Sequence, residues 1–133
     1  KKHVKYQLKL LQKQKAKNNS EIILNQVYLQ ARVVELQSIR HTPAGLPVLD
    51  LMLAHSAEVI EAAHQRRVEF TIMARALGPQ ATQLQAIAIG TELRVEGFLA
   101  PTRKNSTKLV LHIQAVSFSA QHTGSVANTS YMV

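Results

Sequence analysis

The sequence predicts an all-β fold of five successive strands, with one short helix between the third strand and the fourth. Three observations between residues 25 and 118 predict it. Apolar and polar residues alternate with a period of two, as in strands that bury one face. Glycine and proline separate these stretches, as at turns. Apolar residues fall at helical spacing once, directly after Pro79.

The first two strands flank a tight turn. The first covers residues 25–37, and the second starts at Pro47. Between them, Pro43 and Gly45 occupy the second and fourth positions of a type I turn at residues 42–45. The predicted inward residues of the two strands are Val27, Leu29, Ala31 and Val33, then Leu49, Leu51 and Leu53.

The segment before the third strand lacks a strand period. Residues 56–65 contain two acids and no regular alternation, so we expect a long, mobile hairpin connection there. The third strand begins near Arg67 and ends before Gly78. Its predicted core face carries Val68, Phe70, Ile72, Ala74 and Ala76. Pro79 suits the first turn of a helix. The predicted inward residues of that helix are Ala81, Leu84 and Ile87.

The last two strands flank a polar loop. The fourth strand covers residues 92–99, and Gly97 within it indicates a bulge or a sharp bend. The loop covers residues 101–107, and the fifth strand covers residues 108–118. Residues 119–133 are polar and predicted to be a disordered tail.

This order of elements is that of an OB-fold, a five-stranded Greek-key barrel that is partly open. In that fold, the loops between strands 1 and 2 and between strands 4 and 5 border an oligonucleotide groove. Here Arg40 lies in the first of these loops, and Arg103, Lys104 and Lys108 lie in or beside the second. The basic loops therefore fall where this fold would bind an oligonucleotide.

The net charge of +8 is unevenly distributed. Residues 1–20 contain seven lysines and no acid, whereas the remainder has nine basic residues and eight acids. We therefore expect three parts: a basic extension at residues 1–24, the OB-fold domain at residues 25–118, and the tail. The extension is either a flexible segment or a basic amphipathic helix for nucleic acid or anionic membrane.

A groove for single-stranded DNA needs cations for the phosphates and flat side chains on which bases stack. The candidate DNA-binding residues are Arg40, Arg66, Arg67, Phe98, Arg103, Lys104 and Lys108. Phe98 is predicted to face outward, where it could stack a base. Phe70 is predicted to be core, and Tyr28 could serve a dimer contact.

The sequence contains no pattern typical of catalysis. It has no cysteine, and its six histidines are scattered without metal-ligand spacing. We expect no enzyme, no metal site and no cofactor. No apolar run approaches the roughly 18 residues that span a bilayer, and a soluble, cytoplasmic and nucleoid-associated protein is expected.

Three stretches resemble a known bacterial family. They are RHTPAGLPVLDLMLAH at residues 40–55, IGTELRVEGFLA at residues 89–100, and KLVLHIQAV at residues 108–116. The family is primosomal replication protein N, most closely its β-proteobacterial members, within the single-stranded DNA-binding proteins. The resemblance implies an OB-fold homodimer that binds single-stranded DNA in replication restart and bridges the primosomal helicase and the loader protein. The alternative is a barrel that mainly docks proteins, with weak nucleic-acid binding or binding through the N-terminal extension.

Overall fold

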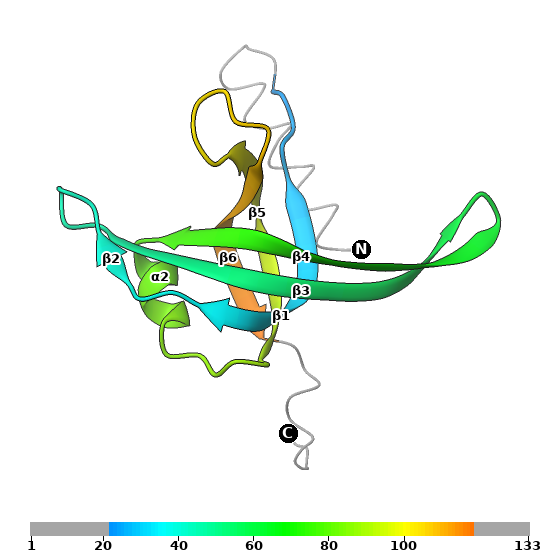
Figure 1. Cartoon of the computed structure of the whole chain (residues 1–133), viewed down its shortest axis with the longest axis horizontal. Helices are drawn as coiled ribbons and strands as arrows, with labels where there is room; N and C mark the ends of the chain where they lie inside the picture. The colour runs from blue at the N-terminus through cyan, green and yellow to red at the C-terminus, as the bar shows by residue number, and fades with distance from the viewer. Residues whose placement is uncertain (1–21, 119–133) are drawn as a thin grey trace.

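The computed structural model describes residues 22–118. The predictions for the tail and for almost all of the N-terminal extension lie outside the described residues. The elements are β1 (Val27–Leu36), β2 (Arg40–His41), β3 (Pro47–Glu61), β4 (His64–Leu77), α2 (Pro79–Leu84), β5 (Glu92–Pro101) and β6 (Leu109–Phe118) (Figure 1). The predicted helix and strand order are therefore confirmed, and β2 is a two-residue addition that pairs with the start of β3.

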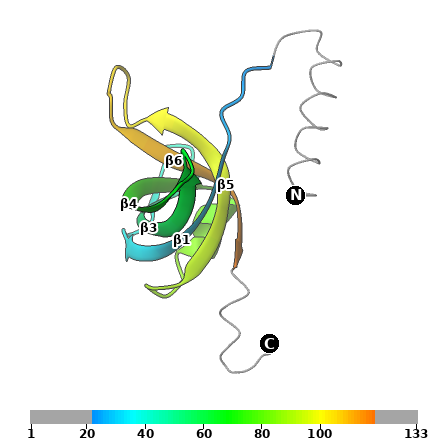
Figure 2. The ribbon, with the colours of Figure 1, turned by 90° about the vertical axis from the view of Figure 1, so that its right-hand side faces the viewer.

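The strands close into a barrel. Their order is β1-β5-β6-β4-β3-β2, and β1 also pairs with β3, so the sheet returns to its first strand. All pairs are antiparallel except β4 with β6. Figure 2, which views the barrel from the side of the β3–β4 hairpin, shows the strands curving around a common centre. This closed barrel with one short helix is the OB-fold that the sequence predicts.

The core contains most of the inward residues that the strand period predicts, together with two residues of the helix. Its largest fully buried side chains are Leu49, Leu51, Leu53, Leu84, Leu93, Leu111, Val33 and Val95. Helix α2 contributes Ala81 and Leu84, both with no exposed surface, and packs against β3, β4 and β6. Each buried leucine contributes about 1.5–3 kcal/mol of transfer free energy relative to an exposed one.

The expected mobile connection at residues 56–65 is wrong, because that segment is regular β-structure. The β3–β4 ladder continues without a break to the pair of Glu61 and His64. Ala62 and Ala63 make the turn with φ values of 51° and 67°, as both central residues of a type I′ hairpin require. We call residues 55–70 the hairpin arm. Most of its side chains are exposed on both faces, so no alternation of apolar and polar residues marks it in the sequence.

Gly97 lies at a bulge, as predicted. The register between β5 and β6 shifts between Glu96 and Gly97. A Cβ atom built on Gly97 would overlap the backbone carbonyl oxygen of His112. Only glycine lets the two strands approach this closely.

Asn25 extends the barrel beyond the end of β1. Its side-chain Nδ2 donates to the carbonyl oxygen of Leu99 at 2.8 Å, and its Oδ1 accepts from the amide of Leu99 at 3.0 Å. The amide side chain thus reproduces one pair of a strand ladder.

Candidate nucleic-acid interface

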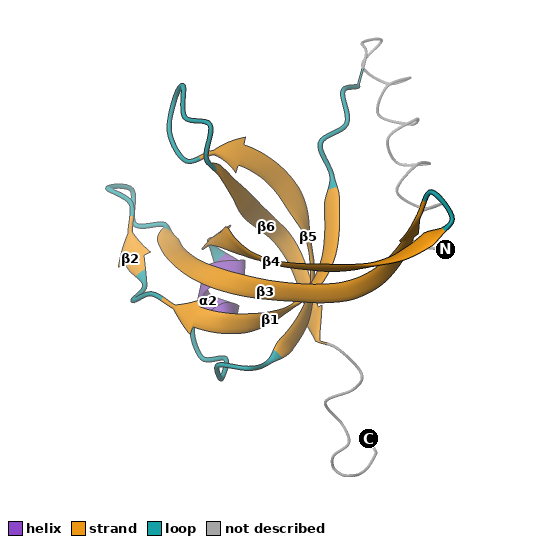
Figure 3. Cartoon of the chain, turned by 45° about the vertical axis from the view of Figure 1, so that its right-hand side comes forward, coloured by secondary structure: helices purple, strands orange, loops and turns teal. Residues whose placement is uncertain are grey.

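The two predicted groove loops lie toward one side of the barrel, and the tip of the hairpin arm lies toward the other. Figures 1 and 3 both show the β2–β3 turn and the β5–β6 loop on the side away from the arm tip. The structure therefore brings Arg40 and the cations of the β5–β6 loop to the same side of the barrel. It places Arg66 and Arg67 separately, on the arm.

The β5–β6 loop is a structured turn that presents three cations to solvent. The amide of Thr102 donates to the carbonyl oxygen of Lys108 at 2.9 Å, and Ser106 Oγ accepts from the Lys108 amide at 3.0 Å. Arg103, Lys104 and Lys108 are exposed. Within residues 22–118, none of the three forms an ion pair. Their charge is available to an anionic ligand.

A single aspartate fixes two arginines on the outward face of β3 and β4. Arg75 Nε donates to Asp50 Oδ1 at 2.7 Å, and Arg40 Nη1 donates to Asp50 Oδ2 at 3.0 Å. Because one carboxylate holds two guanidinium groups, the cluster keeps one net positive charge. Arg40, whose side chain is 51% exposed, thus reaches the groove side in a held position.

Phe98 and His112 form a stacked pair beside this cluster. They lie directly opposite each other on β5 and β6. Their ring centroids are 5.0 Å apart, and the ring planes differ by 6°. Phe98 points outward as predicted, while its neighbour in the chain, Gly97, is buried. The pair thus places two partly exposed, stacked rings on the outward face.

The pKa of His112 is lowered from the usual 6.5, first by burial and then by the positive charge of Arg75, with Asp50 acting in the opposite sense. Between the lowered pKa and 6.5, the unfolded chain therefore binds more protons than the folded chain. The stability that this histidine contributes is present above pH 6.5 and is lost as the pH falls through its folded pKa.

We therefore expect the thermal unfolding midpoint of the wild type to fall more steeply on acidification below about pH 6.5 than that of His112→Gln, which has no titrating ring. Thermal unfolding followed by circular dichroism at half-unit steps from pH 8 to pH 5 measures the difference. Parallel curves for the two proteins would contradict the assignment of His112 as the source.

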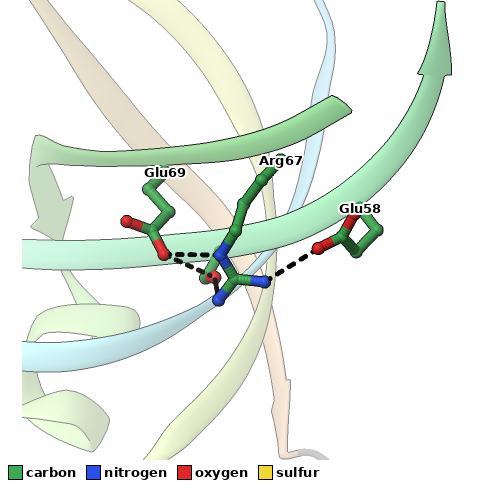
Figure 4. Close-up of polar contacts among 4 residues, drawn as sticks. Glu58, Arg67 and Glu69 are labelled. Atoms are coloured by element: carbon green, nitrogen blue, oxygen red, sulfur yellow. Dashed lines mark hydrogen bonds and ion pairs between the residues drawn. The ribbon is translucent and has the colours of Figure 1, made fainter. Parts of the chain in front are cut away.

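The arginines of the hairpin arm are paired with glutamates of the same arm. Arg67 contacts Glu69 at 2.8 Å and Glu58 at 3.1 Å, as Figure 4 shows, and Arg66 contacts Glu61 at 2.7 Å. These contacts raise the pKa of Arg67, mainly through the Glu69 hydrogen bond, and lower the pKa of Glu69. Three carboxylates thus face two guanidinium groups, so the arm offers phosphates less free charge than the β5–β6 loop does.

Phe70 does not belong to the core, contrary to the prediction. Its side chain is 39% exposed, and its ring packs on that of His55 with centroids 5.0 Å apart. The period of the third strand correctly places Phe70 on the face of Ala74 and Ala76, which are buried. Phe70 pairs with His55 of β3, whereas the β1–β3 ladder ends at Ala54. Phe70 therefore lies on the hairpin arm, where no opposing strand among the described residues covers its side chain.

Three residues of the groove face, His112, Arg75 and Asp50, were not predicted from the sequence. They become neighbours through the parallel pairing of β4 with β6, in which Arg75 lies opposite His112. The sequence predicts the strands but carries no direct signal for the register of a parallel pair. The alternation of apolar and polar residues in β3 and β4 does place Asp50 and Arg75 outward. This alternation was the one sequence signal from which their place on the groove face could have been predicted.

Residues 25–115 match the model of a family described as "another single-strand binding protein family". Among curated proteins, the chain is 56% identical over 91 residues to the replication restart protein PriB of Bordetella pertussis, covering 68% of this chain and 85% of that protein. It is 37% identical to the PriB of Nitrosomonas europaea, covering 71% of this chain and 88% of that protein.

Solved structures show the same similarity. The PriB protein of Ralstonia solanacearum superposes with a TM-score of 0.66 at 41% identity, covering 72% of this chain and 98% of that one. The single-stranded DNA-binding protein of Thermus aquaticus gives a TM-score of 0.60 at 28% identity, covering 74% of this chain and 52% of that one. Within the described residues, no helix is long and apolar enough to cross a membrane.

Proposed function

This chain belongs to the PriB family of replication restart proteins, within the single-strand binding protein family, and we propose that it binds single-stranded DNA through one side of its barrel. The observation that carries the proposal is the set of cations on the β5–β6 loop that form no ion pair within residues 22–118, on the two strands that also carry the outward aromatic pair. Arg103, Lys104 and Lys108 contact phosphates, and Phe98 stacks a base. Arg40 adds a further cation, and Arg66 and Arg67 make a lesser contribution because glutamates already hold them.

The role follows from the relatives, which are named replication restart proteins. We propose that the chain acts at restarting replication forks in the cytoplasm, associated with the nucleoid. There it bridges the primosomal helicase and the loader protein while holding the displaced strand. It acts as a binding protein, and no step of the proposed function involves catalysis.

The test is fluorescence anisotropy of a labelled oligo-dT at several salt concentrations, with the full chain and with a form that starts at Asn25. We expect both forms to bind with similar affinity. The affinity should fall with salt by about 0.7 log units per log unit of salt for each phosphate contact. If only the full chain binds, the N-terminal lysines act as the tether and the barrel groove is not the site.

A second candidate function is a barrel that mainly docks other proteins. The hairpin arm favours it, because its arginines are paired and its tip exposes Val59 and Ile60, which are 40% and 72% exposed. Binding that changes little with salt, or loss of binding in the form starting at Asn25, would support this candidate instead.

We further propose that the protein is a homodimer joined along β1. Within residues 22–118, residues 27–31 pair with β5 on one side, and pairing with β3 begins only at Arg32. On the other edge of this segment, the carbonyl oxygen of Gln30 contacts His55 Nδ1 at 2.7 Å, but no described strand pairs with it before Arg32. An edge without a strand partner can take a second strand. Tyr28, which is 44% exposed, lines a shallow hollow of about 480 Å³ on the adjoining outward face. A second copy of β1 would close the edge and extend the sheet.

Sedimentation velocity is expected to give twice the mass of the chain. The chain has no cysteine, so a single Gln30→Cys variant provides a clean test of the edge. Under oxidation it should form a disulfide-linked dimer, because the same segment of two copies meets at the two-fold axis. The matched variant Gln85→Cys, on the exposed side after α2, should remain uncrosslinked. A monomeric mass at micromolar concentration would refute this interface.

A further inference from the structure

A row of side chains crosses the outward face of four neighbouring strands. Asp50 of β3 lies opposite Arg75 of β4. Arg75 lies opposite His112 of β6, and His112 lies opposite Phe98 of β5. The residues on either side of Arg75, Ala74 and Ala76, have no exposed surface, so the row itself faces away from the core. Four elements that are distant in sequence thus form one surface.

The two rings in this row are arranged before any ligand binds. Phe98 and His112 are parallel within 6°, and each is partly exposed. Because the rings already support each other, a base that stacks on them would not have to order them first. Stacking of a base on an aromatic side chain tolerates any sequence, since every base has a flat face.

The cation of the row, Arg75, lies one strand away from His112, and neighbouring strands are about 4.7–4.9 Å apart. Arg75 reaches Asp50 through Nε, and no described residue occupies its terminal Nη atoms. A positive group beside partly exposed aromatic rings matches the two parts of a nucleotide, the phosphate and the base. The lowered pKa of His112 supports this division, because the ring stays neutral and Arg75 carries the charge.

We propose that Phe98 and His112 form the base-stacking site of the groove, and that Arg75, positioned by Asp50, contacts the phosphate of the stacked nucleotide. This inference rests on the proposed function. It adds His112 and Arg75 to the DNA-binding residues, and it supplies the stacking surface in a chain that has no tryptophan.

The test compares two oligomers of equal length, oligo-dT and an abasic deoxyribose-phosphate strand, by anisotropy competition at one salt concentration. We expect the wild type to prefer oligo-dT. His112→Ala and Phe98→Ala should each lose about fivefold or more in affinity for oligo-dT, with little change for the abasic strand. His112→Phe keeps a ring and should keep the preference. His41→Ala, which removes an exposed histidine from β2, should behave as the wild type.

Arg75→Gln should weaken binding of both oligomers, because it removes a phosphate contact and no stacking surface. Melting curves identify any variant that has lost its fold. If His112→Ala is such a variant, the oligo-dT preference of His112→Phe tests the stacking site in its place. Equal losses on both oligomers for His112→Ala, or an unchanged preference for oligo-dT, would overturn the stacking site. Binding of neither oligomer by the wild type would instead reject the proposed function.

Discussion

Reversal of both Arg103 and Lys104 to glutamate is expected to reduce the affinity for oligo-dT by at least roughly 25-fold near 0.1 M salt. Two phosphate contacts are lost, and each contributes about 0.7 to the slope of log affinity against log salt. Over the tenfold change from 1 M to 0.1 M salt, the two contacts together contribute about 1.4 log units, or about 25-fold. The slope itself should fall by about 1.4. Anisotropy titrations at four or more salt concentrations measure both quantities. The unfolding midpoint should stay unchanged, because the two side chains are exposed and unpaired among the described residues.

The matched control reverses Arg66 and Arg67 on the hairpin arm, which changes the net charge by the same amount. A smaller loss is expected there, since both arginines already contact glutamates. If the two double variants lose affinity equally, net charge governs binding, and the β5–β6 loop is not a specific phosphate-binding site. If the loop variant binds as tightly as the wild type, the assignment of the groove is wrong.

The second large effect concerns Gly97. Gly97→Ala places a Cβ atom on the carbonyl oxygen of His112, a backbone atom held in the β5–β6 ladder. The strands must separate, and we expect a loss of about 3 kcal/mol in the free energy of unfolding. For a domain of this size the midpoint should fall by more than about 10 °C. Urea denaturation and thermal melting measure the change.

Gly90→Ala is the control for Gly97→Ala. Gly90 has a φ of +96°, and a Cβ atom there would meet nothing within 4 Å. Only backbone strain remains, at a cost of about 1–2 kcal/mol. A loss at Gly97 no larger than that at Gly90 would show that β5 and β6 can relax around the added methyl group.

The sequence predicts the barrel well because most of its strands bury one face. Leu49, Leu51 and Leu53 alternate with less buried neighbours, and this period is visible without a structure. The hairpin arm could not be predicted in this way. Residues 56–61 are held by backbone pairing to β4 and have little to bury, so their composition resembles that of a loop. A strand pair that buries few side chains leaves almost no trace in side-chain periodicity.

The candidate site divides in the same way. The position of the loop cations could be predicted from the order of the strands, because the OB-fold has its oligonucleotide groove beside particular loops. The partners of Arg67 do not follow, because the contact with Glu58 depends on a register between two strands whose turn the sequence did not reveal. The stack of Phe98 on His112 likewise depends on the pairing register of β5 with β6, which the predicted bulge at Gly97 does not specify.

The closure of the barrel has a consequence for how the chain folds. β3 and β4 are adjacent in sequence, whereas β1 pairs with β5, so Gln26 bonds Glu96 across 70 positions. Closing so long a loop costs entropy before any contact repays it, and folding in milliseconds to seconds is typical of such topologies. During synthesis the apolar side of β3 must wait for β5 and β6 to emerge. Until then Leu49, Leu51 and Leu53 face water, and the newly made chain is most prone to aggregate over that interval.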